Sequence, residues 1–157
     1  MSKYFENVFT QILKELECDY ATNVHLSNTS DPKNDFIEID ALVKKNDRQI
    51  VYFENKTTLS KFNIDDTICK IEKFHSFLLD AYPDLTFEYI IISPYCDETI
   101  KESYWYFAKN GYAAREDIKH YTYNFVIPLA KFDNISLRCI VEPEYEKMKT
   151  LINSIIR

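Results

Sequence analysis

The segment TFEYIIIS, residues 86–93, is almost wholly apolar over the length of one β-strand. A strand with one solvated face alternates apolar and polar residues, so a continuous apolar run indicates a strand that is covered on both faces. Such strands lie centrally in sheets that carry helices on either side. The segment therefore predicts an α/β domain with helices packed against a sheet.

Periodicity and turn residues predict the remaining elements. In chain order they are a helix over 3–17, strands over 21–27, 35–44 and 49–56, a helix from Asp65 or Asp66 to about Ala81, the strand over 86–93, a helix over 97–109, strands within YTYNFVIPL and SLRCIV, and a last helix from near Pro143. The predicted α-β-β-β-α-β core favours a mixed sheet flanked by helices. Pro128 cannot donate a ladder hydrogen bond, so its strand is expected at an edge of the sheet or to end there.

Composition excludes several classes of function. A single glycine in 157 residues leaves no glycine-rich loop for nucleotide phosphates, and the four cysteines form no C-x-x-C pair for zinc. No apolar run has the length of a membrane span, and the amino terminus lacks the apolar core of a signal peptide. We therefore expect one domain over residues 1–157, located in the cytoplasm without membrane contact.

The net charge of −6 opposes general attraction to nucleic acid, because phosphate neutralisation by Lys and Arg supplies most non-specific affinity. Local basic clusters in VKKNDR, KTTLSK and KIEK would have to compensate, but each contains or adjoins acidic residues. Aromatic clusters in ESYWYF and HYTYNF are candidates for stacking on unpaired bases, although their spacing is also that of core positions.

The strand IVYFENK places charged residues in an otherwise apolar run. Because side chains alternate along a strand, Glu54 and Lys56 point the same way and Asn55 points opposite. Asp40, on the preceding strand, can pack across from Glu54 if the turn is tight. Two carboxylates held close repel each other unless a cation intervenes, and oxygen ligands suit Mg²⁺ or Mn²⁺. An ordinary cross-strand salt bridge is the simpler explanation of the same spacing.

The pattern resembles the PD-(D/E)XK, or restriction-endonuclease-like, nuclease superfamily over roughly the first 95 residues. EIDALV is similar to the strand that bears the family's acidic metal ligand, and VYFENKTT to the strand that bears its E-x-K motif. The family's order of a Glu-bearing helix, ligand strand, E-x-K strand and further helix is matched over residues 3–81. Within the family, the chain most resembles nuclease domains of prokaryotic defence systems, including those attached to cyclic-oligonucleotide sensors in CRISPR loci.

The resemblance implies a restriction-endonuclease-like fold and a metal-dependent endonuclease that uses a metal-activated water. Asp40 and Glu54 would bind Mg²⁺ or Mn²⁺ together with the backbone carbonyl of Asn55, and Lys56 would position the water and stabilise charge on the phosphate. Two features depart from the family pattern. Asn55 stands where a small or apolar residue is usual, and the ligand loop lacks the Pro-Asp dipeptide.

The two predicted helices offer further site residues. Glu6 is similar to the family's helix-borne Glu, whereas helical geometry puts Glu15 nearer the apolar stripe, so both are candidates. Lys70, on the second helix, is a candidate phosphate contact, with a solvated lysine as the alternative.

The expected substrate is DNA, with RNA as the alternative, in a prokaryotic defence or DNA-processing context. A homodimer or a larger complex is a further expectation, because small domains of this type commonly work in pairs. Two other hypotheses stay open. One is a catalytically inactive module on the same fold that binds nucleic acid or protein. The other is an unrelated α/β adaptor whose hairpin charges are salt bridges.

Overall fold

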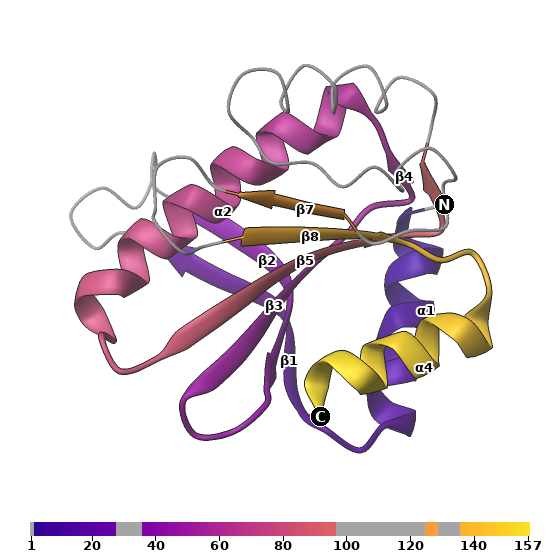
Figure 1. The fold of residues 1–157 in the computed structure, drawn as a ribbon, viewed down its shortest axis with the longest axis horizontal. Coiled ribbons are helices and arrows are strands. Elements are labelled where there is room, and N and C mark those ends of the chain that lie inside the picture. Colours follow the sequence, from indigo (N-terminus) through magenta and orange to yellow (C-terminus); the bar gives the residue numbers. More distant parts are fainter. Residues whose placement is uncertain (1, 28–35, 97–124, 129–135) are drawn as a thin grey trace.

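The computed structural model describes residues 2–27, 36–96, 125–128 and 136–157 (Figure 1). Its elements are α1 (Ser2–Glu15), β1 (Asp19–Ser27), β2 (Phe36–Lys44), β3 (Gln49–Asn55), β4 (Thr58–Leu59), α2 (Lys61–Ala81), β5 (Thr86–Ser93), β6 (Tyr95–Cys96), β7 (Phe125–Pro128), β8 (Ser136–Val141) and α4 (Tyr145–Ile156). The helix predicted over 97–109 and most of both aromatic clusters lie outside the described residues. No helix in the described ranges is both long and apolar enough to cross a membrane.

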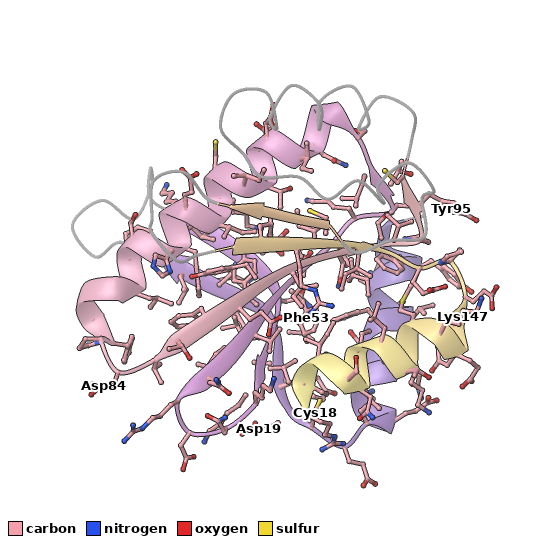
Figure 2. The ribbon with its side chains drawn as sticks, in the orientation of Figure 1. Cys18, Asp19, Phe53, Asp84, Tyr95 and Lys147 are labelled. Carbon is pink, nitrogen blue, oxygen red and sulfur yellow. The ribbon has the colours of Figure 1, made fainter. Side chains whose placement is uncertain are left out.

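Six strands form one mixed sheet in the order β1-β2-β3-β5-β8-β7. The first three pair antiparallel, β3, β5 and β8 run parallel, and β7 returns antiparallel at the edge, as Pro128 predicts. The parallel strands all end at one side of the sheet, which we call the carboxyl edge. Figure 2 shows Tyr95 at this edge and Asp84 at the opposite one. The predicted α/β fold with a mixed sheet and flanking helices is confirmed.

Helices cover both faces of the sheet, with α2 on one side and α1 and α4 on the other (Figure 1). Under α2, the ring of Tyr52 packs 4.8 Å from that of Phe74. On the other face, the ring of Phe9 packs 5.1 Å from that of Phe53. Strand β5 contributes buried side chains to both cores, as its continuous apolar run predicts.

The side-chain alternation of β2 shifts at Asp40. Ile39 packs in the core under α2, whereas Ala41, two residues later, packs in the core under α1 and α4. Across the β1–β2 ladder, Asn23 lies at the same level and has a φ of 51°, a left-handed conformation that Asn tolerates better than most residues. Local distortions of this kind re-aim a side chain. Here they place Asp40 where β2 stops pairing with β3, after the Ala41–Phe53 pair.

Helix α2 begins at Lys61, so the prediction of a start at Asp65 or Asp66 is wrong. Asn63 Oδ1 accepts the backbone N–H of Ser60 at 3.0 Å, and its amide nitrogen donates to the Thr58 carbonyl at 2.6 Å. This is the arrangement of a capping box with Asn in place of Glu. The cap provides hydrogen-bond partners for backbone groups at the start of the helix, about one turn before the position that Asp65 or Asp66 would cap.

Asn63→Ala is expected to lower the free energy of unfolding by about 1 kcal/mol, because both side-chain hydrogen bonds of this cap are lost. Urea unfolding followed by circular dichroism measures the change. Ser76→Ala is the matched control on the same helix, because the exposed Ser76 hydroxyl makes only a local hydrogen bond to the Glu72 carbonyl one turn earlier. An equal loss in both variants would show that Asn63 is not a cap.

Candidate active site at the carboxyl edge

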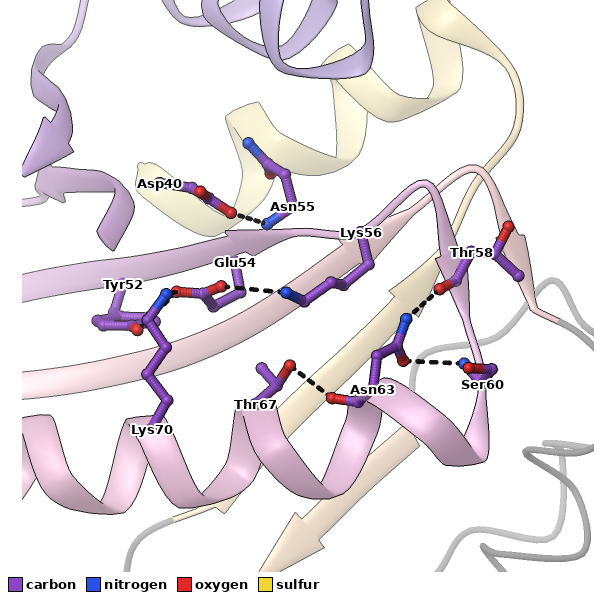
Figure 3. Close-up of polar contacts among 10 residues, drawn as sticks. All are labelled: Asp40, Tyr52, Glu54, Asn55, Lys56, Thr58, Ser60, Asn63, Thr67 and Lys70. Atoms are coloured by element: carbon purple, nitrogen blue, oxygen red, sulfur yellow. Dashed lines mark hydrogen bonds and ion pairs between the residues drawn. The ribbon is translucent and has the colours of Figure 1, made fainter. Parts of the chain in front are cut away.

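Strand β3 carries a buried carboxylate near its end. Glu54 is 1% exposed and lies on the α2 side of the sheet, in line with Tyr52. The Tyr52 hydroxyl donates to Glu54 Oε1 at 2.7 Å, and Lys70 Nζ lies 2.8 Å from the same oxygen. Lys56 Nζ lies 3.7 Å from the other oxygen, Oε2 (Figure 3). A charge can remain buried only with partners of this kind, which explains two lysines around one carboxylate.

Asp40 occupies the gap left where β2 and β3 separate. Its Oδ2 accepts the backbone N–H of Asn55 at 2.7 Å, in place of the carbonyl of a paired strand. Burial, and then the negative charge of Glu54, raise the pKa of Asp40 to about 6, against the opposing effect of the Asn55 N–H and the two lysines. Asp40 therefore changes charge just below neutral pH.

Asn55 leaves a polar atom unsatisfied. In the described part of the chain, its buried Oδ1 has no hydrogen-bond partner. An unsatisfied buried carbonyl costs about 1–3 kcal/mol. The unsatisfied Oδ1 is therefore a candidate metal ligand. It belongs to the same residue whose backbone N–H donates to Asp40.

Four of the predicted site residues, Asp40, Glu54, Asn55 and Lys56, lie where β2 and β3 separate, and the structure divides them into two pairs, Asp40 with Asn55 and Glu54 with Lys56. In the view of Figure 3, Asp40 and the Asn55 side chain lie on one side of the β3 ribbon, whereas Glu54 and Lys56 lie on the other. The two carboxylates share no hydrogen-bond donor among the described residues. Within the same ranges, no three His, Cys, Asp or Glu side chains are grouped closely enough to hold a metal by themselves.

No family model, curated protein or solved structure matches the chain. Two carboxylates and two ammonium groups make the cluster of Asp40, Glu54, Lys56 and Lys70 formally neutral when all four are ionised.

The oxygen donors fit a hard divalent cation. The Asp40 carboxylate and the unsatisfied Asn55 Oδ1 are ligand types that Mg²⁺ and Mn²⁺ prefer. Glu54, on β3 beside Asn55, is a second carboxylate, but its oxygens contact Tyr52, Lys56 and Lys70.

The two helix-borne candidates lie far apart on α1. Glu15 accepts from the Tyr145 hydroxyl at 2.8 Å and pairs with Lys149 at 3.0 Å, which links α1 to α4 at the surface. Lys149 and then Tyr145 lower the pKa of Glu15 through these hydrogen bonds. Glu6 lies nine residues earlier, about 13 Å along the helix axis, near the carboxyl edge. It is half-buried and makes no side-chain hydrogen bond or ion pair within the described residues, so Glu6 is the better candidate.

Sequence reasoning missed Tyr52 and undervalued Lys70. The signal for Tyr52 was its position two residues before Glu54, which puts both on one face of β3. From the sequence Lys70 is a candidate phosphate contact or a solvated lysine, and its ion pair with Glu54 is not predicted. Its approach to Glu54 depends on how α2 crosses the sheet, which periodicity does not report.

Proposed function

We propose that the protein is a Mg²⁺- or Mn²⁺-dependent nuclease of the PD-(D/E)XK type that hydrolyses phosphodiester bonds of DNA, with RNA as the alternative substrate. The observation that carries the proposal is the buried Glu54, paired with lysines from two elements beside Asp40, where β2 and β3 separate. A hairpin stabilised by a salt bridge alone has no need to bury its carboxylate. The order α1, β1, β2, β3, α2, β5, interrupted only by the two-residue β4 before α2, supports the resemblance to the family.

Each side chain has a distinct task in this proposal. Asp40 and the Asn55 side-chain oxygen would hold the metal on one side of β3, and Glu54 would join as the second carboxylate on release from Lys56 and Lys70. A bound divalent ion lowers the pKa of the attacking water and neutralises charge on the phosphate oxygens. Lys56, the looser partner of Glu54, orients the water and contacts the scissile phosphate. Lys70 neutralises Glu54 from α2.

A second candidate is a catalytically inactive module on the same fold that binds nucleic acid or a protein. One observation favours it: Tyr52, Lys56 and Lys70 already satisfy Glu54 without any ligand. Such a module would keep the cluster as structure. The defence context, the cytoplasmic location and the homodimer or larger complex stay predictions under either candidate.

The test is cleavage of supercoiled plasmid and of a labelled RNA, each with Mg²⁺, with Mn²⁺ and with EDTA. We expect cleavage with either metal, none in EDTA, and loss of cleavage in Glu54→Gln, which keeps the side-chain volume but removes the charge. Glu88→Gln is the matched control, because Glu88 is a partly exposed residue of the neighbouring strand β5, paired with Arg138. Wild type that cuts neither substrate with either metal, or Glu54→Gln that cuts as well as wild type, would leave the inactive module as the better explanation.

A further inference from the structure

A groove of about 320 Å³ lies at the carboxyl edge, beside the candidate active site. Its walls come from the first turns of α1 and α4 and from the segments that follow β3 and β5, and they include Tyr4, Phe5, Thr57, Tyr95 and Tyr145. The lining is mainly aromatic and aliphatic. We call it the Tyr4/Tyr95 groove.

Two rings of this groove are unusually exposed. Tyr4 is 72% exposed and Tyr95 is 61% exposed. Among the described residues, the only other exposed large hydrophobic side chain is Tyr82, which is less exposed, at 54%. Tyr95 projects outward from the edge of the molecule in Figure 2. An exposed aromatic ring is a platform on which a planar base can stack.

The groove lies on the α1 and α4 side of the sheet and reaches the carboxyl ends of β3 and β5. Thr57 directly follows Lys56, and the Lys56 N–H donates to the carbonyl of Ile92 at 3.0 Å, three residues before Tyr95. Glu6 follows Tyr4 and Phe5 on the same turn of α1. The Lys56 ammonium lies on the α2 side with Glu54 (Figure 3), so a strand bound in the groove passes over the carboxyl edge before its next phosphate reaches Lys56. Ligands of α/β sheets commonly bind at this edge, beyond the carboxyl ends of parallel strands.

We propose that the Tyr4/Tyr95 groove binds an unpaired nucleobase, so that the substrate of the nuclease is single-stranded nucleic acid. The proposal rests on the proposed function and names its substrate class. The faces of bases inside a duplex are covered by their neighbours, so only an unstacked base can stack on the rings of the groove. Stacking also supplies affinity without positive charge, which resolves how a chain of net charge −6 holds a polyanion.

The test measures binding in EDTA, where no cleavage occurs, by fluorescence anisotropy. The probes are a labelled oligo(dT) and an abasic oligonucleotide of the same length, which keeps the phosphates and lacks the bases. We expect wild type to bind oligo(dT) roughly tenfold or more tightly than the abasic probe. Tyr95→Ala and Tyr4→Ala should remove most of this preference. Tyr82→Ala is the matched control, because Tyr82 follows α2 at the opposite edge of the sheet, and it should bind like wild type.

Three results would overturn the groove proposal. The first is equal binding of the two probes by wild type, and the second is an unchanged preference in Tyr95→Ala and Tyr4→Ala. The third is a wild-type dimer in sedimentation that Tyr95→Ala converts to monomers, which would assign the groove to a second copy of the chain. Tyrosine-dependent binding without any cleavage would instead contradict the nuclease proposal and would agree with base binding in the groove. The two failures are therefore distinguishable.

Discussion

Lys56→Met is expected to lower the rate of phosphodiester cleavage by about 10²–10³-fold while changing the stability of the fold little. Lys56 Nζ is the more distant cation of the pair, at 3.7 Å from Glu54 Oε2. When Lys56 is removed, Lys70 and Tyr52 still contact the buried carboxylate, so the substitution lowers the cleavage rate and not the free energy of unfolding. Single-turnover cleavage at saturating Mg²⁺ measures the rate, and urea unfolding measures the stability.

Lys70→Met is the informative comparison, because Lys70 and Lys56 have equally exposed side chains and contact the same carboxylate. Lys70 Nζ lies 2.8 Å from Glu54 Oε1, so its removal leaves a buried charge with one distant cation. We expect a loss of about 1–3 kcal/mol in the free energy of unfolding, reduced from the fully buried case by the solvent that reaches the ammonium group. Equal effects of both substitutions on rate and on stability would contradict this division of roles.

Local pattern was enough to predict the features of the site that depend on one strand. The period of two along IVYFENK places Glu54 and Lys56 on one face, and the structure has them there as an ion pair. The apolar run of β5 predicts burial on both faces, and its side chains enter both cores. These inferences hold because each depends on neighbouring residues alone.

The features that sequence did not reveal depend on residues distant along the chain. Ile37, Ile39, Ala41 and Val43 appear as one continuous face of β2, yet the structure divides them between the two cores. The shift occurs opposite Asn23, whose left-handed conformation has no signature in the β2 sequence. The start of α2 was wrong for a local reason: aspartates are good caps, but Ser60 and Asn63 form a cap one turn earlier.

Asp40→Asn is expected to stabilise the protein at neutral pH. The folded-state pKa of Asp40 is raised from 3.8 to about 6, so the folded protein binds this proton more tightly than the unfolded chain does. The stability associated with neutral Asp40 is fully present below about pH 4 and is lost as the pH rises through 6. A shift of this size corresponds to at most about 3 kcal/mol above pH 7. Asn resembles the neutral form and keeps an oxygen to accept the Asn55 N–H.

The measurement is urea unfolding of wild type and Asp40→Asn from pH 4 to pH 8 in EDTA. The two proteins should be nearly equal at pH 4, and the variant should become the more stable one as the pH passes 6. Asp84→Asn is the control, because Asp84 is an exposed aspartate at the opposite edge of the sheet (Figure 2), and its difference from wild type should not follow this pH course. A variant no more stable than wild type at pH 8 would mean that the carboxylate contributes more through its hydrogen bond than its burial costs.

The same substitution should abolish cleavage, because an uncharged amide is a poor ligand for Mg²⁺ where a carboxylate is required. A gain in stability that coincides with a loss of activity is the expected signature of a residue kept for chemistry at the expense of folding. The inactive module predicts the gain in stability without any activity to lose. An adaptor predicts the same gain, because among the described residues Asp40 accepts the Asn55 N–H and belongs to no ion pair. The cleavage assay therefore separates the nuclease from both non-catalytic candidates.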